Sequence, residues 1–124
     1  MKEEMMLEKK TWAVVGASEN PEKYGYKIFK KLKARGYKVY PVNPNYETLL
    51  GEVCYKNLSS IPEKPEVIDM VVAPKHGMAT IAEAAELGIQ NIWLQPGTFN
   101  DELMSLIEEK GLESVQACVL VALR

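Results

Sequence analysis

Short apolar runs alternate with stretches of helical periodicity along this chain. The apolar runs, which are typical of strands buried on both faces of a sheet, cover residues 12–15, 37–42, 67–72 and 89–94. After the first run, four residues have the i, i+3, i+4, i+7 spacing of one helical face: Gly25, Ile28, Phe29 and Leu32. Helical spacing recurs at residues 78–85 and 103–107. The pattern therefore predicts strands that alternate with amphipathic helices.

Glycines and one asparagine mark the ends of these predicted helices. Gly36, Gly88 and Gly111 follow the periodic stretches, where a left-handed residue commonly ends a helix. Asn100 precedes the third stretch and is a favourable N-cap, because its side-chain oxygen accepts from the N–H groups of the first turn. These signals predict helices that lead through short loops into the next strand.

The alternation predicts an α/β fold, a Rossmann-like, doubly wound and mostly parallel sheet of five to six strands with helices on both faces. We expect the strand order 3-2-1-4-5-6, with a short strand at residues 53–55 on the edge. Residues 115–123 are expected to form the last strand, with no helix after it. We expect residues 1–10 to be a flexible tail and residues 11–124 to be one domain.

Composition and charge narrow the class of protein. The 124 residues are 47% hydrophobic, which suits one packed domain. A formal net charge of −2 predicts no basic surface for nucleic acid, and the apolar run at 117–123 is far shorter than a membrane span. The mixed Lys and Glu residues at the start do not resemble a signal peptide, and two cysteines are too few for a disulfide framework. We therefore expect free thiols and a cytoplasmic protein.

Four short segments directly after the predicted strands carry unusual backbone chemistry. They are Gly16-Ala17-Ser18, Val42-Asn43-Pro44, Val72-Ala73-Pro74 and Gln95-Pro96-Gly97. In an open parallel sheet the carboxyl ends of the strands lie along one edge, and ligands bind in the crevice there. We therefore expect a site for a nucleotide-like ligand at this edge.

The first of these segments has the physical features of a phosphate-binding turn. Gly16 permits a tight turn, and Ala17 and Ser18 are small enough for a phosphate to approach the backbone. The following helix offers unpaired N–H groups and the positive end of its dipole, and Gly25 lets it pack close to the strand. No G-x-G-x-x-G motif is present, so a tight turn closed by small residues is the alternative.

The end of the second predicted strand argues against a nicotinamide cofactor. NAD-binding folds carry an acidic residue there, or an Arg that meets a 2′-phosphate, whereas Val42-Asn43-Pro44 is uncharged. Prolines 44, 74 and 96 each stop a strand, which is an ordinary role for one proline. Together on one edge, their rigid turns suit the stacking of an adenine and the packing of a long arm.

Groups suited to catalysis or metal binding are sparse. His76 is the only histidine, and a capping or surface role fits it best because no Ser or Cys partner is near it in the sequence. Cys54 and Cys118 lack metal-ligand spacing, so we expect no metal site. Three lysines near helix starts are candidates to contact a phosphate, although a solvated lysine is the plainer interpretation: Lys23, Lys27 and Lys75.

Several motifs together indicate a family. They are V-V-G-A-S-x-N-P at residues 14–21, Y-G at 24–25, Y-P-V-N-P-x-Y at 40–46, G-x-x-C-Y at 51–55 and W-L-Q-P-G at 93–97. With them the chain resembles, over residues 11–121, the small stand-alone CoA-binding proteins of bacteria and archaea. Their domain is also the first domain of the succinyl-CoA synthetase α subunit and of related NDP-forming acyl-CoA synthetases.

The resemblance implies where coenzyme A (CoA) lies on this sequence. The turn at Gly16, Ala17 and Ser18 would hold the CoA phosphates, with Asn20, Tyr24 and Gly25 beside them. The other implied contacts follow the same edge: Val42, Asn43 and Pro44 on the adenosine side, Ala73 and Pro74 at the switch point, and Gln95, Pro96 and Gly97 along the arm.

The leading hypothesis is a module that binds CoA or an acyl-CoA without catalysis, because the chain lacks the phosphohistidine and the nucleotide-binding partner domain of the synthetases. The alternative, a small NAD(P)-dependent oxidoreductase, rests only on the Rossmann-like layout. A third hypothesis is a partner subunit or regulator that docks on a larger acyl-CoA enzyme, and the chain itself is expected to be a monomer or a homodimer. Cys118 lies in an apolar run where the family often has a polar one, and it is a candidate for a mixed disulfide with the CoA thiol.

Overall fold

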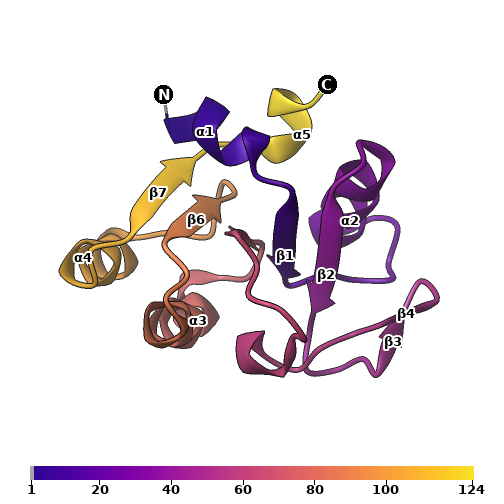
Figure 1. Ribbon diagram of the computed structural model, residues 1–124, viewed down its shortest axis with the longest axis horizontal. Coiled ribbons are helices and arrows are strands. Elements are labelled where there is room, and N and C mark those ends of the chain that lie inside the picture. Colours follow the sequence, from indigo (N-terminus) through magenta and orange to yellow (C-terminus); the bar gives the residue numbers. More distant parts are fainter. Residues whose placement is uncertain (1) are drawn as a thin grey trace.

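A five-stranded parallel sheet forms the centre of the computed structural model, which describes residues 2–124 (Figure 1). Its strands are β1 Thr11–Val15, β2 Lys38–Val42, β5 Val67–Met70, β6 Asn91–Leu94 and β7 Glu113–Gln116. They lie in the order β2-β1-β5-β6-β7, and every neighbouring pair is parallel. This confirms the predicted α/β class and the relative order of the five long strands.

Helices cover both faces of the sheet (Figure 1). They are α1 Lys2–Glu8, α2 Tyr24–Ala34, α3 Pro74–Leu87, α4 Asp101–Glu109 and α5 Val119–Ala122, with a short 3-10 helix, η1, at Leu58–Ser60. Because side chains alternate along a strand, Trp12 packs in the core beneath α1, α2 and α5, whereas Ala13 packs in the core beneath α3 and α4. The two faces therefore have separate hydrophobic cores.

The predicted helix ends agree with the structure. Asn100 caps α4, since its Oδ1 accepts a hydrogen bond from the Leu103 N–H at 2.8 Å. Gly88 ends α3 with a left-handed backbone, at φ 78°. Short connections at these ends allow each helix to return the chain to the next parallel strand.

The prediction of a short edge strand at residues 53–55 is wrong. The chain instead forms an antiparallel hairpin of β3 Thr48–Leu49 and β4 Glu52–Val53, separate from the main sheet. Only Tyr55 reaches the edge of the main sheet, where it forms an isolated parallel bridge with Val42. The pairing of β3 with β4 takes up Val53, the first of the three residues that the pattern assigned to an edge strand.

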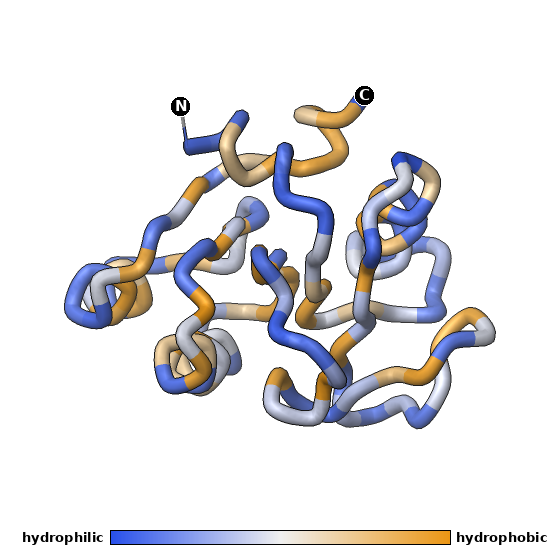
Figure 2. Tube along the Cα trace, viewed as in Figure 1, coloured by the Kyte–Doolittle hydropathy of each residue, from blue (hydrophilic) through white to orange (hydrophobic). Residues whose placement is uncertain are grey.

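The final apolar run is also not one strand. The chain leaves the sheet after Gln116 and turns into α5, which the hydropathy colouring of Figure 2 marks as mostly hydrophobic. Val119 is fully buried, and its N–H donates to the Gln95 Oε1 at 3.2 Å. A buried helix turn and a buried strand have the same apolar run in sequence, and this contact with Gln95 favours the turn.

The expected flexible tail covers residues 1–10, of which residue 1 lies outside the described residues, and residues 2–10 differ from that expectation. Residues Lys2–Glu8 form α1, and Met6 is completely buried in the core beneath it. The Tyr37 hydroxyl donates to the Leu7 carbonyl at 2.5 Å, and the Trp12 indole N–H donates to the Lys9 carbonyl at 2.9 Å. These contacts hold the segment against the sheet.

Candidate functional site

Two cavities lie side by side at the carboxyl edge of the sheet. The first lobe, of about 710 Å³, lies between the end of β2, η1 and α3. The second lobe, of about 820 Å³, lies between the start of α2, the loop after β6 and Cys118. Gly16, Asn43, Asn45 and Val72 line both lobes. The shared wall is at the switch point between β1 and β5, where open α/β sheets bind ligands, and the paired lobes suit an elongated one.

Two glycines shape the turn at this shared wall. Gly16 has φ +103°, and a Cβ there would lie 2.9 Å from Cγ1 of Val72. A Cβ on Gly25 would lie 2.1 Å from the Gly16 carbonyl oxygen, so the first turn of α2 touches the β1 loop directly. Only glycine fits this approach, which brings the N-terminus of α2 against the end of β1.

Unpaired backbone N–H groups gather around this turn. Within residues 2–124, the N–H groups of Ser18, Tyr24 and Gly25 donate to no protein acceptor, and all three residues line the second lobe. Lys23, at the N-cap of α2, has no side-chain capping bond and also lines this lobe. Free amides at the positive end of a helix dipole are suited to bind an anion such as a phosphate group.

Asn43 connects the two loops that form the shared wall. Its Nδ2 donates to the Ala17 carbonyl at 2.8 Å, and its Oδ1 accepts from the Asn45 N–H at 2.9 Å. The Cys54 thiol lies behind it, 3.6 Å from the Asn43 carbonyl oxygen, and burial raises the pKa of Cys54 above its usual value. Asn43 therefore has a structural role in the site besides any contact with a ligand.

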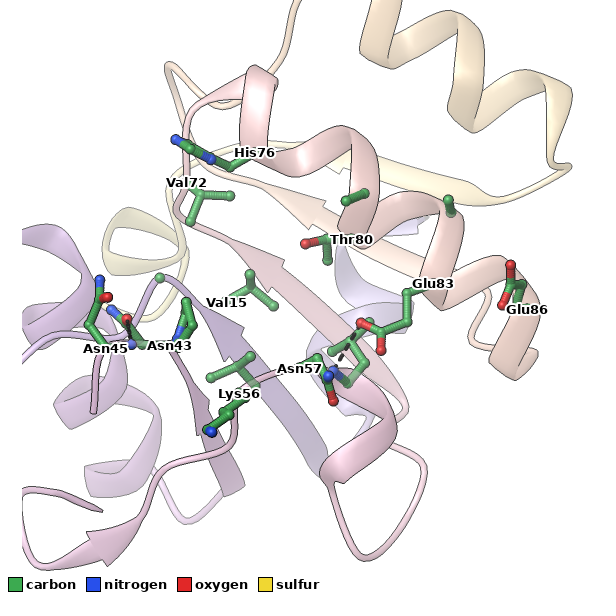
Figure 3. A pocket seen from close by; sticks show the side chains of 16 residues that line it. Val15, Asn43, Asn45, Lys56, Asn57, Val72, His76, Thr80, Glu83 and Glu86 are labelled. Carbon is green, nitrogen blue, oxygen red and sulfur yellow. Dashed lines mark hydrogen bonds between the residues drawn. The ribbon is translucent and has the colours of Figure 1, made fainter. Parts of the chain in front are cut away.

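The first lobe is polar on two opposite sides (Figure 3). Glu83 and Glu86 lie on α3, while Lys56 lies on the side of the β2 end, with its amine directed away from α3. The Glu83 carboxylate accepts from the N–H groups of Leu58 at 3.0 Å and Ser59 at 3.1 Å. Glu83 thus holds η1 in place, whereas Lys56 is in no ion pair within residues 2–124.

A buried carboxyl lies behind the second lobe. Asp69 is completely buried in β5, and burial raises its pKa to about 8, against a smaller opposite effect of its hydrogen bond with Gln95. Gln95 Nε2 donates to Asp69 Oδ1 at 2.6 Å, while Asp69 Oδ2 has no partner within residues 2–124. Because the Val119 N–H can only donate, it requires the oxygen of the Gln95 amide, which directs the nitrogen to Asp69.

Eleven of the fourteen residues predicted for the site line the cleft. Those in the second lobe, some shared with the first, are Gly16, Ser18, Tyr24, Gly25, Asn43, Ala73, Gln95, Pro96 and Gly97. Val42 and Pro44 line the first lobe. The other three residues line neither lobe: Ala17 is buried behind the loop, Asn20 caps the turn before α2 through its Oδ1, and Pro74 begins α3.

Sequence reasoning missed several residues that line the cleft. Asn45 and Tyr46 directly follow the predicted Pro44, so the same loop could have indicated them. Lys56 and Glu83 carried no such signal, because the hairpin and α3 bring them to the lobe from other parts of the chain. The cleft is therefore wider than the strand ends alone indicate.

Two other classes of feature are absent from residues 2–124. No cluster of three or more His, Cys, Asp or Glu side chains is placed to hold a metal ion. No helix in this range is long and apolar enough to cross a membrane.

Comparisons with known proteins find relatives of this chain. The chain is 38% identical over 90 residues to subunit alpha of the ADP-forming acetate–CoA ligase II of Pyrococcus furiosus. The aligned residues make up 72% of this chain and 20% of that subunit. The chain therefore spans about a fifth of that relative's length. It is 27% identical to the uncharacterized protein YneT of Bacillus subtilis, over 96% of the chain and 89% of YneT.

A solved structure has a similar fold. A hypothetical protein from Pyrococcus horikoshii OT3 superposes with a TM-score of 0.87 at 39% identity, over 94% of this chain and 82% of that one. The family described as CoA binding domain matches residues 10–124, nearly the whole sequence. On this match, the chain belongs to the CoA-binding domain family.

Proposed function

We propose that this chain binds coenzyme A or an acyl-CoA in the two-lobed cleft, as a binding, carrier or regulatory module without chemistry of its own. The observation that carries the proposal is the group of free amides at Ser18, Tyr24 and Gly25, which line the second lobe next to Gly16 of the shared wall. A pyrophosphate accepts hydrogen bonds from such amides, as it does at other glycine-lined helix starts. The adenosine then lies in the first lobe, and the pantetheine arm lies in the second.

The arrangement of reactive side chains supports a role without catalysis. His76 lines only the first lobe and Cys118 lines only the second. A thiol and its general base act within hydrogen-bond reach of each other, whereas these two side chains line different lobes. The NAD(P)-dependent oxidoreductase alternative gains no support from the family or from the relatives.

Calorimetric titration with CoA, acetyl-CoA and NAD tests the proposal. We expect one CoA species to bind most tightly, and tighter binding of NAD would overturn the proposal. Ser18→Asp places a carboxylate beside the free amides, where it competes with the ligand phosphate. We expect this variant to fold and to lose at least tenfold in CoA affinity, which corresponds to about 1.4 kcal/mol.

A matched variant controls for the added charge. Ser105 is exposed on α4 and lines neither lobe, so Ser105→Asp adds the same charge away from the cleft. We expect its CoA affinity to equal that of the wild type. Equal losses in both variants would show that net charge, rather than the amide cradle, controls binding.

The likeness to part of an acetate–CoA ligase subunit favours a second candidate role, as a module that docks on an acyl-CoA enzyme. Light scattering would separate a monomer from a homodimer. Co-elution with a purified acyl-CoA synthetase in the presence of CoA would support docking, and separate elution at micromolar concentrations would contradict it.

A further inference from the structure

We propose that Lys56 recognises the ribose 3′-phosphate of CoA, so that this residue distinguishes CoA from nucleotides without that group. The inference rests on the proposed function and assigns one further contact within the same cleft. The position of Lys56 in the fold matters here, since an exposed lysine alone indicates no ligand.

The backbone fixes Lys56 at the end of β2. Tyr55 pairs with Val42 in an isolated parallel bridge. Its N–H donates to the Pro41 carbonyl at 3.0 Å, and its carbonyl accepts from the Asn43 N–H at 2.9 Å. Lys56 follows directly, so a residue from beyond the hairpin occupies the space beside the β2 carboxyl end. In dinucleotide-binding folds, the residues around this end select between a free ribose hydroxyl and a ribose phosphate.

The end of β2 carries no charge of its own. The three residues directly after β2 are Asn43, Pro44 and Asn45, and all are uncharged. They therefore include no acidic side chain to bind a ribose hydroxyl and no basic side chain to bind a phosphate. Lys56 supplies a positive charge at that place through the fold. A cation there favours a phosphorylated ribose over an unphosphorylated one.

Lys56 is free to contact a ligand. Within residues 2–124, the lysines in ion pairs are Lys2, Lys33 and Lys38, so Lys56 has no acidic partner. Its side chain lines the first lobe with Asn45, and Figure 3 shows its amine directed away from the carboxylates on α3. A phosphate at Lys56 therefore avoids Glu83 and Glu86, and the amino group of the adenine remains available as a donor on their side of the lobe.

The test compares CoA with 3′-dephospho-CoA, which differ only in the phosphate in question. For the wild type we expect CoA to bind about tenfold more tightly than 3′-dephospho-CoA, because one hydrogen bond to a charged group contributes about that much. For Lys56→Met we expect this ratio to fall to about one, with the affinity for dephospho-CoA unchanged. A wild-type ratio near one, or an equal ratio in the variant and the wild type, overturns the assignment.

Two control variants separate Lys56 from other basic groups of the cleft. His76→Gln removes the other basic side chain of the first lobe and should keep the tenfold ratio. Lys23→Met, in the second lobe, should weaken both ligands by the same factor. If the ratio of CoA affinity to dephospho-CoA affinity fell to about one in either control but not in Lys56→Met, the 3′-phosphate would bind elsewhere in the cleft.

The same titrations keep this inference distinct from the proposed function. Binding of neither CoA nor dephospho-CoA to the wild type refutes the proposed function itself. Binding of both with equal affinity refutes only the role of Lys56. NADP carries a 2′-phosphate on the corresponding ribose. Tighter binding of NADP than of CoA would therefore contradict the proposal that Lys56 recognises the 3′-phosphate of CoA.

Discussion

Replacement of Asp69 by asparagine removes a buried ionisable group while keeping its shape. Asp69 is completely buried, and burial raises its pKa to about 8 from an ordinary value of 3.8. Asparagine retains an Oδ1 that accepts from Gln95 Nε2, the bond that spans 2.6 Å in the wild type. Its Nδ2 takes the position of Oδ2, which has no partner in the described chain. The substitution therefore mainly removes the titration.

The effect on stability follows from proton linkage. Between pH 4 and 8 the folded state keeps the proton on Asp69, while the unfolded state releases it. The free energy of unfolding therefore falls as the pH rises through this range, by up to about 1.4 kcal/mol per pH unit. Between pH 5.5 and 7.5 the wild type should lose about 3 kcal/mol from this group, a large share of the 5–15 kcal/mol typical of a domain.

Urea unfolding of both proteins across this range measures the difference. We expect the stability of Asp69→Asn, relative to the wild type, to rise by about 3 kcal/mol from pH 5.5 to 7.5. Other titrating groups are common to both proteins and cancel in the difference. The exposed Asp101 offers a control, since Asp101→Asn should shift stability by a constant amount. Parallel curves for Asp69→Asn and the wild type would refute the assignment of a protonated Asp69.

Three further substitutions test how the site is held. Gly25→Ala places a methyl group where a Cβ lies 2.1 Å from the Gly16 carbonyl oxygen, so we expect a loss of about 3 kcal/mol and weaker CoA binding. Met6→Ala empties a fully buried position under α1 and should cost about 3 kcal/mol in urea unfolding; an unchanged midpoint would mean that α1 does not pack there. Asn100→Ala removes the cap of α4 and should cost about 1 kcal/mol, with CoA affinity unchanged; an equal loss of affinity would contradict a purely structural cap.

Much of the sheet and the turn after β1 could be predicted because their signals are local. The apolar runs give the strands, and a left-handed glycine ends a helix wherever it occurs, as Gly88 does at φ 78°. The close approach of α2 to β1 also follows from local sequence, since Gly25 lies nine positions after Gly16 at the start of the helical periodicity. The 2.1 Å clash of a Cβ at Gly25 shows the physical reason for the glycine.

Features that depend on contacts between distant segments could not be predicted. The turn into α5 depends on the Val119 N–H bond to Gln95, and Lys56 reaches the end of β2 only because Tyr55 bridges to Val42. Asp69 did carry a signal, as the single charged residue in the apolar run at 67–72. Its buried position becomes evident only beside Gln95, 26 residues later in the chain.

A crystal structure of the protein with CoA at saturating concentration tests the central claim most directly. The account predicts pyrophosphate density within hydrogen-bond distance of the amides of Ser18, Tyr24 and Gly25, with adenosine in the first lobe and the arm in the second. Well-ordered CoA bound away from these amides, or an empty cleft at saturation, would contradict it.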